Sequence, residues 1–247
     1  LWAGTLLTGD LGNSIMSNMP IATLIGQRIE PTLSIAASTM FVSVLIALPM
    51  GIAAAWGTRT WVDRTTMVFA ILGFSLPVFL VGYALMYLFA IKLGWFPVQG
   101  YRPLAQGIVP WLQGLVLPTV ALSFTYVALL ARTTRASMLE VLAEDYIRTA
   151  QAKGVHTRAL LFKHAFSNAA IPVVTVVGIG VTLLISGVVI TETVFNIPGL
   201  GRLTVDAILS RDYPIIQALI LIFAGVYVVL NLVIDLIYVF LDPRIEY

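Results

Sequence analysis

Long apolar stretches dominate the order of residues along the chain. Five windows carry no charged side chain, and they cover residues 31–58, 65–91, 103–131, 165–191 and 213–234. Each window is longer than the roughly 20 residues that a helix needs to cross about 30 Å of hydrocarbon. A charge at the centre of such a span costs about 2.5–3.5 kcal/mol on insertion scales. The pattern therefore predicts five transmembrane helices in an all-α integral membrane protein.

The third window carries residues that interrupt helices, namely Pro103, Gly107, Pro110, Gly114 and Pro118. We therefore expect its first half to be irregular or re-entrant, with the crossing nearer 115–134. Composition agrees with a membrane class, because 59% of the residues are hydrophobic, 11% are charged and the mean hydropathy is +0.96. So few charges do not cover a soluble globule of 247 residues. The absence of cysteine excludes disulfides and thiolate metal sites.

Basic residues set the expected orientation of the helices. Alternating the loops puts one group on one side: Arg59, Arg64, Arg132, Arg135, Arg148, Lys153, Arg158, Lys163 and Arg244. The other side receives Arg28, Lys92, Arg102, Arg202 and Arg211. The richer side is expected to be cytoplasmic, which makes 1–31 an extracytoplasmic segment, 32–247 the transmembrane domain and the C-terminus cytoplasmic. Because the chain starts at Leu1 with an outside N-terminus, we expect a sixth span upstream.

A polar insert at about 132–164 interrupts the apolar pattern. Leu142, Tyr146, Ala150 and Gly154 recur every four residues, which predicts one face of a helix that continues past Ala131. Glu144 and Arg148 are spaced as an i,i+4 pair on that helix. Lys153 falls in its last turn, and Gly154 suits a left-handed C-cap because it has no Cβ.

A return helix is expected after this turn, with Thr157 as its cap and Pro172 near its end. Ala150, Ala152 and Gly154 leave little side chain at the corner, so a partner surface could approach closely. The alternative is that these small residues only pack the hairpin against its own subunit. Spacing alone does not separate the two interpretations.

The loop at about 192–212 is expected to form a second, shorter helix on the outer side. Pro198, Gly199 and Gly201 break the preceding helix. An apolar face can then form from Leu200, Leu203, Val205, Ile208 and Leu209. This segment is either a docking surface or a simple interfacial connector.

Residues 144–154, which read EDYIRTAQAKG, resemble the cytoplasmic EAA loop of ATP-binding-cassette (ABC) importer permeases of the dipeptide, oligopeptide and nickel group. Further similar segments are HAFSN at 164–168, IPVVT at 171–175, ETVFNIPGLGRL at 192–203, RDYP at 211–214, NLVIDLIY at 231–238 and LDPR at 241–244. GDLGNS at 9–14 and PTL at 31–33 match the B type of the two permease subunits. The chain departs from the general pattern at Arg148, Thr149 and Ala150, which occupy the Glu-Ala-Ala positions, and at Ser167, where many permeases have proline.

The resemblance implies a type I ABC importer permease fold with a helical coupling loop, in a bacterial or archaeal inner membrane. It implies a second homologous permease, two ATPase subunits that hold ATP and Mg, and an extracytoplasmic solute-binding protein. The chain itself lacks a G-x-x-x-x-G-K-[ST] phosphate loop, so it is not expected to be the ATPase. No Ser, His and Asp set has a catalytic arrangement, so no other catalytic site is expected. The implied ATPase contacts are Arg148, Thr149, Ala150, Ala152, Lys153, Gly154 and Val155. Docking of the binding protein is expected at Pro198, Gly199 and Arg202.

Short peptides are the first expectation for the solute, with a nickel chelate or glutathione as alternatives. Uncharged polar side chains in the windows are candidates for the path, namely Ser75, Asn168, Thr175 and Thr182. A proton-coupled secondary transporter, the alternative from another class, would need an ionisable group deep in a span. The candidates Glu192 and Asp235 lie at span ends, where a position at the headgroup level or local pairing is the simpler expectation. His156 and His164 lack a carboxylate ligand set, so no metal site is expected.

Overall fold

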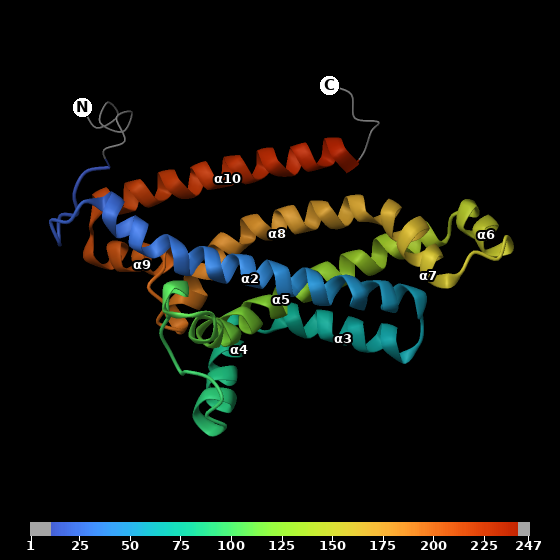
Figure 1. The fold of residues 1–247 in the computed structure, drawn as a ribbon, viewed down its shortest axis with the longest axis horizontal. Coiled ribbons are helices and arrows are strands. Elements are labelled where there is room, and N and C mark those ends of the chain that lie inside the picture. The colour runs from blue at the N-terminus through green and yellow to red at the C-terminus, as the bar shows by residue number, and fades with distance from the viewer. Residues whose placement is uncertain (1–10, 242–247) are drawn as a thin grey trace. The chain divides into compact units, whose positions relative to one another are not determined.

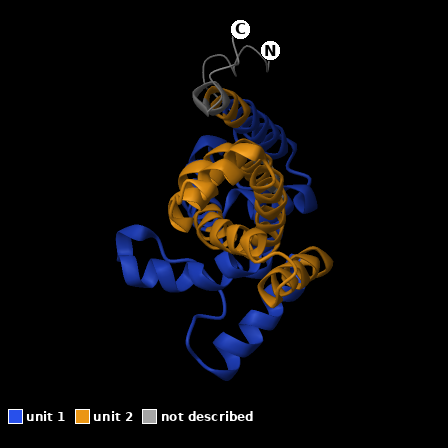
Figure 2. Ribbon diagram, turned by 90° about the vertical axis from the view of Figure 1, so that its right-hand side faces the viewer, with its two compact units in different colours: residues 1–38, 78–122, 182–229 blue, residues 39–77, 123–181, 230–247 orange. Residues whose placement is uncertain are grey.

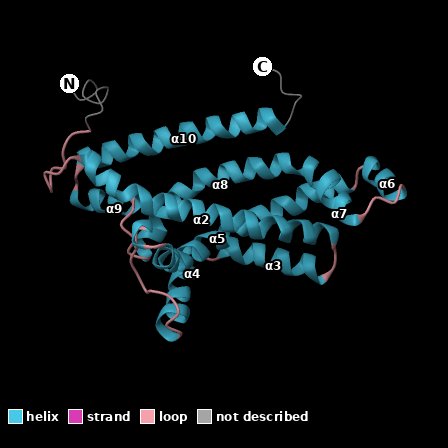
Figure 3. Cartoon of the chain, in the orientation of Figure 1, coloured by secondary structure: helices cyan, strands magenta, loops and turns pink. Residues whose placement is uncertain are grey.

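Helices form almost all of the protein in a computed structural model that describes residues 11–241 (Figure 1). The described residues outside the helices form turns and loops, with one isolated antiparallel bridge between Asn13 and Pro20 (Figure 3). The expectation of an all-α fold is therefore confirmed. The ends of two sequence motifs, at 9–10 and 242–244, lie outside the described residues.

The helical elements follow one another along the chain with short connections. They are α2 (Ile21–Trp56), α3 (Trp61–Ser75), α4 (Val78–Leu85), the π-helical η1 (Met86–Lys92), the 3₁₀ turn η2 (Leu104–Gln106), α5 (Ile108–Leu142), α6 (Asp145–Ala152), α7 (Thr157–Ala159), the π-helical η3 (Leu160–Phe166), α8 (Ser167–Val194), α9 (Leu200–Ser210) and α10 (Tyr213–Leu241).

Four continuous helical stretches are long and apolar enough to cross a membrane. They cover Ile21–Trp56, Ile108–Leu142, Thr157–Val181 and Tyr213–Leu236. A fifth candidate is the pair Trp61–Ser75 and Val78–Lys92, which passes the same test as one broken span or as a re-entrant loop. Residues 11–241 thus contain four candidate spans, or five if the pair is one span, in the order that the uncharged windows predict.

The window 65–91 is not one continuous helix, which corrects the simplest interpretation of that window. Helix α3 ends at Ser75, and Leu76 takes an extended backbone with φ −93° and ψ 121°. Pro77 follows directly, and a residue before proline is pushed out of the helical region by the proline ring. Helix α4 then starts afresh at Val78.

The third window also differs from its prediction, because α5 begins at Ile108 and not near 115. The irregular part is short and ends at Gly107, whose φ of +119° suits glycine. Pro110 lies in the first turn of the helix, where a missing N–H costs nothing, while Pro118 is accommodated in the interior. Helix α2 likewise begins at Ile21, inside the segment 1–31 that was expected to precede the domain.

The chain divides into two compact units (Figure 2), of which unit 1 comprises residues 1–38, 78–122 and 182–229, with 11–38, 78–122 and 182–229 described. Its apolar core joins α2, α9 and α10, and the buried members are Ile21, Ile25, Leu200, Leu203, Ala207, Ile215, Ala218 and Leu219. A short amphipathic helix is therefore part of the core of this unit. The segment before α2 is also fixed to it, because the buried Asp212 accepts hydrogen bonds from Ser14 Oγ at 2.5 Å and from the Ile15 and Met16 amides at 3.3 Å.

Unit 2 comprises residues 39–77, 123–181 and 230–247, of which 39–77, 123–181 and 230–241 are described. Small residues bring its helices close together, since a Cβ on Gly51 would lie 2.6 Å from Thr134 Cβ. A two-point ion pair also joins α3 to α5. Arg135 Nη2 donates to Asp63 Oδ2 at 2.9 Å, and the second oxygen accepts from Arg135 Nε at 2.5 Å.

Candidate coupling site

The polar insert forms a hairpin in unit 2 whose first arm is broken. Helix α5 ends at Leu142, Glu144 takes an extended backbone with φ −70° and ψ 146°, and α6 begins at Asp145. The prediction of a single helix that runs to Gly154 is therefore wrong. The break turns Ile147 fully inward and leaves Tyr146 43% exposed. The four-residue repeat that predicted one continuous face did not anticipate this rotation.

The ion pair of the hairpin is also different from the expected one. Arg148 Nη1 lies 3.5 Å from Asp145 Oδ1, so the pair is i,i+3 and not the predicted pairing with Glu144. Glu144 occupies the cap position before α6, outside the helix on which an i,i+4 pair would form. Both partners are largely exposed, so the pair contributes little to stability.

Gly154 makes the turn of the hairpin, as predicted. Its φ is +76°, in the left-handed region that favours glycine. The turn is closed by the Gly154 amide, which donates to Gln151 O at 2.9 Å, and by the Val155 amide, which donates to Ala150 O at 3.1 Å. A Cβ on Gly154 would meet no atom within 4 Å. The backbone conformation therefore requires the glycine, and the space around it is open.

The return arm begins at Thr157, and His156 is its cap instead of Thr157. The His156 Nδ1 accepts from the Arg158 amide at 3.3 Å. The arm then continues through α7, η3 and α8 without stopping near Pro172, which lies inside α8. The expected end at that proline was wrong because a long helix with other packing can tolerate one missing N–H.

The seven predicted ATPase contacts divide between two faces of the hairpin. Ala150 and Val155 are half-buried and pack, with the buried Ile147, on the apolar cluster of unit 2. The other five are exposed, and they are Arg148, Thr149, Ala152, Lys153 and Gly154. Packing on the subunit therefore accounts for Ala150, while contact of Ala152 and Gly154 with a partner stays a prediction. One face packs on its own subunit, and the other presents a nearly bare, basic surface.

Asn168 lies against this hairpin. Its Nδ2 donates to Tyr146 Oη at 2.8 Å and to His164 O at 2.8 Å. The sequence placed Asn168 on the translocation path, because an uncharged polar residue in an apolar window suits a pore. In the structure its amide joins α6 to the start of α8, and its place on the path stays a prediction.

The remaining path candidates bond within their own helices. Ser75 is exposed and its hydroxyl donates to Ile71 O at 2.9 Å, while Thr175 is half-buried and donates to Ile171 O at 3.0 Å. The side chain of Thr182 lies outside the described residues. No hydrogen bond joins the described candidates to one another, and their role in a path stays a prediction.

The outer loop contains the predicted short helix, α9, in unit 1. Leu200 and Leu203 are buried in the core as expected, together with Ala207. Ile208 and Leu209 are instead exposed, Leu209 by 78%, so the buried face is narrower than predicted. Of the docking candidates, Pro198 is exposed, Arg202 is half-buried and Gly199 is buried.

Glu192 holds the start of α9 from within the protein. Its side chain is 0% exposed, and it accepts from Thr32 Oγ1 at 2.5 Å and from the Arg202 amide at 2.9 Å. The same Thr32 oxygen accepts from the Leu200 amide at 2.8 Å. First-turn amides of α9 are thus satisfied by side chains from α8 and α2, the arrangement that a helix N-terminus favours. Glu192 is thus paired within the protein, with Arg202 nearby in the chain and with Thr32 far from it, and its burial was not predicted.

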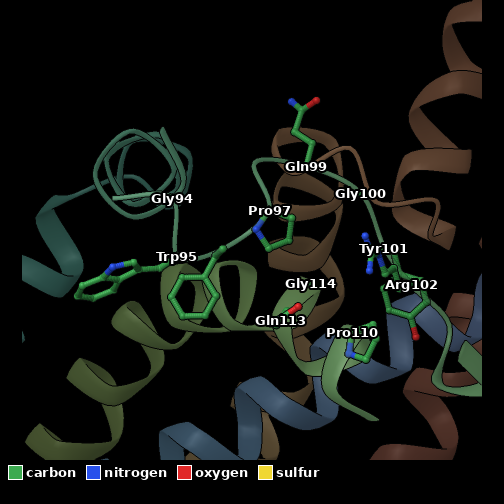
Figure 4. Close-up of a pocket in the computed structure, with 11 residues that line it drawn as sticks. Gly94, Trp95, Pro97, Gln99, Gly100, Tyr101, Arg102, Pro110, Gln113 and Gly114 are labelled. Atoms are coloured by element: carbon green, nitrogen blue, oxygen red, sulfur yellow. The ribbon is translucent and has the colours of Figure 1, made fainter. Parts of the chain in front are cut away.

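A pocket of about 400 Å³ lies between the connection after η1 and the first turns of α5 (Figure 4). Its lining includes Trp95, Gln99, Tyr101, Arg102 and Gln113. Tyr101 Oη donates to Glu30 at 2.9 Å and accepts from Trp111 Nε1 at 3.0 Å, and burial raises the pKa of the Tyr101 hydroxyl. The sequence did not single out this pocket, although its Pro and Gly content marked the irregular backbone.

Comparison with known proteins places the chain among membrane transport components. The model of a family described as binding-protein-dependent transport system inner membrane component matches residues 47–247. A probable peptide ABC transporter permease protein of Sinorhizobium fredii is 52% identical over 246 residues, covering 100% of this chain and 79% of that protein. A glutathione transport system permease protein of Salmonella typhi is 42% identical over 242 residues, covering 98% and 76%.

Two solved structures share the fold. One is the MetNI methionine ABC transporter in an inward-facing conformation, with a TM-score of 0.75 at 16% identity over 90% of this chain and 97% of that chain. The other is an amino acid ABC transporter, with a TM-score of 0.56 at 17% identity over 91% and 95%. At these identities the likeness is one of fold alone.

Proposed function

Because the chain belongs to the family of binding-protein-dependent transport system inner membrane components, we propose that it is the permease subunit of an ATP-driven importer of short peptides. Its type I permease fold and its membrane-spanning helices are those of a multi-pass ABC transporter subunit. The observation that carries the coupling role is the two-faced hairpin. One face is fixed to the subunit through Ile147, and the other is free for a partner.

The exposed face of the hairpin binds a groove of an ATPase subunit in this proposal. The open space around Gly154 lets another backbone approach closely, and Arg148 and Lys153 present positive charge beside it. Two such ATPases, each holding ATP and Mg, act on this chain and on a second homologous permease. Closure of the ATPases moves the hairpins and switches each helical bundle between two packings.

The excess of basic residues in the insert supports a cytoplasmic hairpin and a cytoplasmic C-terminus in the inner membrane. Helix α9 then faces the outside, where a solute-binding protein delivers its cargo. Pro198 and Arg202 are the residues of the predicted docking set that reach the surface there.

Short peptides are the proposed solute because relatives at 52% and 40% identity carry peptide transport names. Glutathione is the second candidate, and the relative from Salmonella typhi favours it. A nickel chelate rests only on the family resemblance. The permease fold leaves no support for a proton-coupled secondary transporter.

Cysteine crosslinking tests the ATPase contact, because the chain has no cysteine of its own. A cysteine at the exposed Ala152, crosslinked in native membranes, should capture a nucleotide-binding subunit that mass spectrometry identifies. A cysteine at Val155, whose side chain packs inward, is the matched control and should capture much less. Equal failure at both positions, with reaction of the Ala152→Cys thiol demonstrated, would remove the proposed coupling role.

The solute is tested in proteoliposomes that hold the complete importer and its binding protein. Uptake of a labelled tripeptide should be competed by other short peptides more strongly than by glutathione. Competition by glutathione alone would reassign the solute and would leave the ATPase contact untouched.

A further inference from the structure

Tyr146 connects α6 to another helix through hydrogen bonds. Its hydroxyl accepts from Asn168 Nδ2 at 2.8 Å and points its own donor toward His164 O at 3.5 Å. Asn168 Nδ2 also donates to His164 O, at 2.8 Å. The three groups close a small triangle between α6 and the start of α8. Among the described side chains of α6, Tyr146 is the one that forms hydrogen bonds with residues outside α6.

The helix that receives this connection is weakened on both sides of Asn168. The preceding segment η3, Leu160–Phe166, is π-helical, a geometry that is rare and is often found at functional sites. Pro172 lies four residues after Asn168 and has no N–H to offer the Asn168 carbonyl. The start of α8 is therefore a place where the helix can change its winding more easily than a regular helix.

We propose that Tyr146 and Asn168 are positioning residues that transmit movement of α6 to α8. The segment η3 is the part of the helix whose winding changes in response. The inference rests on the proposed function, in which the outer face of α6 meets an ATPase. A pull on α6 would reach α8 at Asn168, directly beside the π-helical turn. The sequence motif around 144–154 then includes a residue, Tyr146, whose partner lies outside that motif.

The apolar contact of α6 does not define the direction of such a movement. Ile147 packs in a cluster shared with α2, α5, η3 and α8, and burial of apolar surface is non-directional. A hydrogen bond weakens steeply when its angle falls, so it fixes the register of α6 against α8. An exposed hydrogen bond also contributes much less to stability than burial of Ile147. Loss of the hydrogen bond between Tyr146 and Asn168 should leave α6 in place and reduce only the transmission of movement from α6 to α8.

The test compares uptake with ATP hydrolysis in the complete importer, reconstituted with its binding protein. Tyr146→Phe keeps the ring and removes the hydroxyl. We expect uptake per ATP hydrolysed to fall by at least about fivefold, the lower end of typical coupling between sites, while hydrolysis continues. Asn168→Ala should give the same fall, and the double variant should be no worse than either single variant, because both remove one interaction.

Ser167→Ala is the matched control. Ser167 neighbours Asn168 and is exposed, but its hydroxyl bonds only to Phe162 O at 3.4 Å within its own arm of the hairpin. This variant should keep the ratio of uptake to hydrolysis of the unmodified importer.

Three outcomes overturn the inference. An unchanged ratio in Tyr146→Phe would show that the hydroxyl transmits nothing. Additive losses in the double variant would show that the two residues do not act as a pair. A fall in uptake and hydrolysis together, with less assembled complex, would make the contact merely structural. Failure of the proposed function is distinguishable, because it would abolish capture at Ala152→Cys in the otherwise unmodified chain.

Discussion

Two short surface helices adjoin the two ends of α8, and they are held in different ways. Helix α9 has its first-turn amides capped by the buried Glu192 and the half-buried Thr32, and its apolar face forms part of the core of unit 1. Helix α6 has one fully buried side chain, Ile147, and one hydrogen-bonding side chain that connects it to another helix, Tyr146.

The difference indicates which helix is built to move. Buried hydrogen bonds act in a low dielectric, and leaving their partners unsatisfied is costly. Exposed ones exchange readily with water. Helix α9 is therefore held to α8 by buried groups, whereas the hydrogen bonds that hold α6 to the start of α8 are the exposed ones of Tyr146. We expect substitutions in α9 to lower the amount of folded subunit. Substitutions in α6 should instead lower the coupling of ATP hydrolysis to transport.

Gly201→Ala should have the largest effect. A Cβ there would lie 2.6 Å from Val189 Cα, a backbone atom that cannot rotate away. Helix α9 would have to leave its position, with loss of the bonds to Glu192. We expect strong loss of folded protein, measured as the yield of monodisperse subunit in detergent and its thermal midpoint.

Gly225→Ala is the control for Gly201→Ala, because a Cβ on Gly225 in α10 would meet no atom within 4 Å. It should be neutral or slightly stabilising, since alanine favours helix over glycine. Equal yields of the two variants would contradict the tight fit of α9.

Ile147→Ala should have an intermediate effect on α6. Removing a buried isoleucine costs about 2–5 kcal/mol, but the helix docked by this residue is short and peripheral. We expect the subunit to remain inserted, with faster protease cleavage at the hairpin and strongly reduced uptake. Protection equal to that of the unmodified chain would show that Ile147 does not anchor α6.

Asp145→Asn should have the smallest effect. It removes the exposed pair with Arg148, and pairs of this spacing contribute about 0.2–0.5 kcal/mol. We expect the thermal midpoint and uptake to change little. Loss of complex assembly, measured by copurification of the ATPase subunit, would instead make Asp145 a contact of the partner.

The local features of both helices follow from sequence patterns. Gly154 was expected to take a left-handed turn, and it does, because only glycine occupies that region without a Cβ penalty. The start of α9 was signalled by the proline and glycines before it. The uncharged windows predicted the order of the spans. Like the turn signals, they are properties of consecutive residues and do not depend on distant segments.

The bonds that distinguish the two helices did not follow from such patterns. Glu192 and Thr32 are 160 residues apart, and Tyr146 and Asn168 are 22 apart. The distribution of charged and uncharged residues therefore placed Glu192 at a span end and Asn168 in a path. The break before α6 was missed too, because the direction in which Ile147 points depends on the core that receives it.

The sequence by itself determined that this chain is a membrane protein with a glycine turn in a basic insert, because charge, hydropathy and local turn chemistry are read from neighbouring residues. The permease class was indicated by the resemblance of its motifs to a known family. Only the tertiary structure decided that Glu192 is enclosed as the cap of α9 and that Asn168 holds α6. The burial of a residue and its hydrogen-bond partners are fixed only when distant segments of the chain meet. A residue of one type can either line a pore or join two helices. Asn168 joins two helices because its amide donates a hydrogen bond to the hydroxyl of Tyr146.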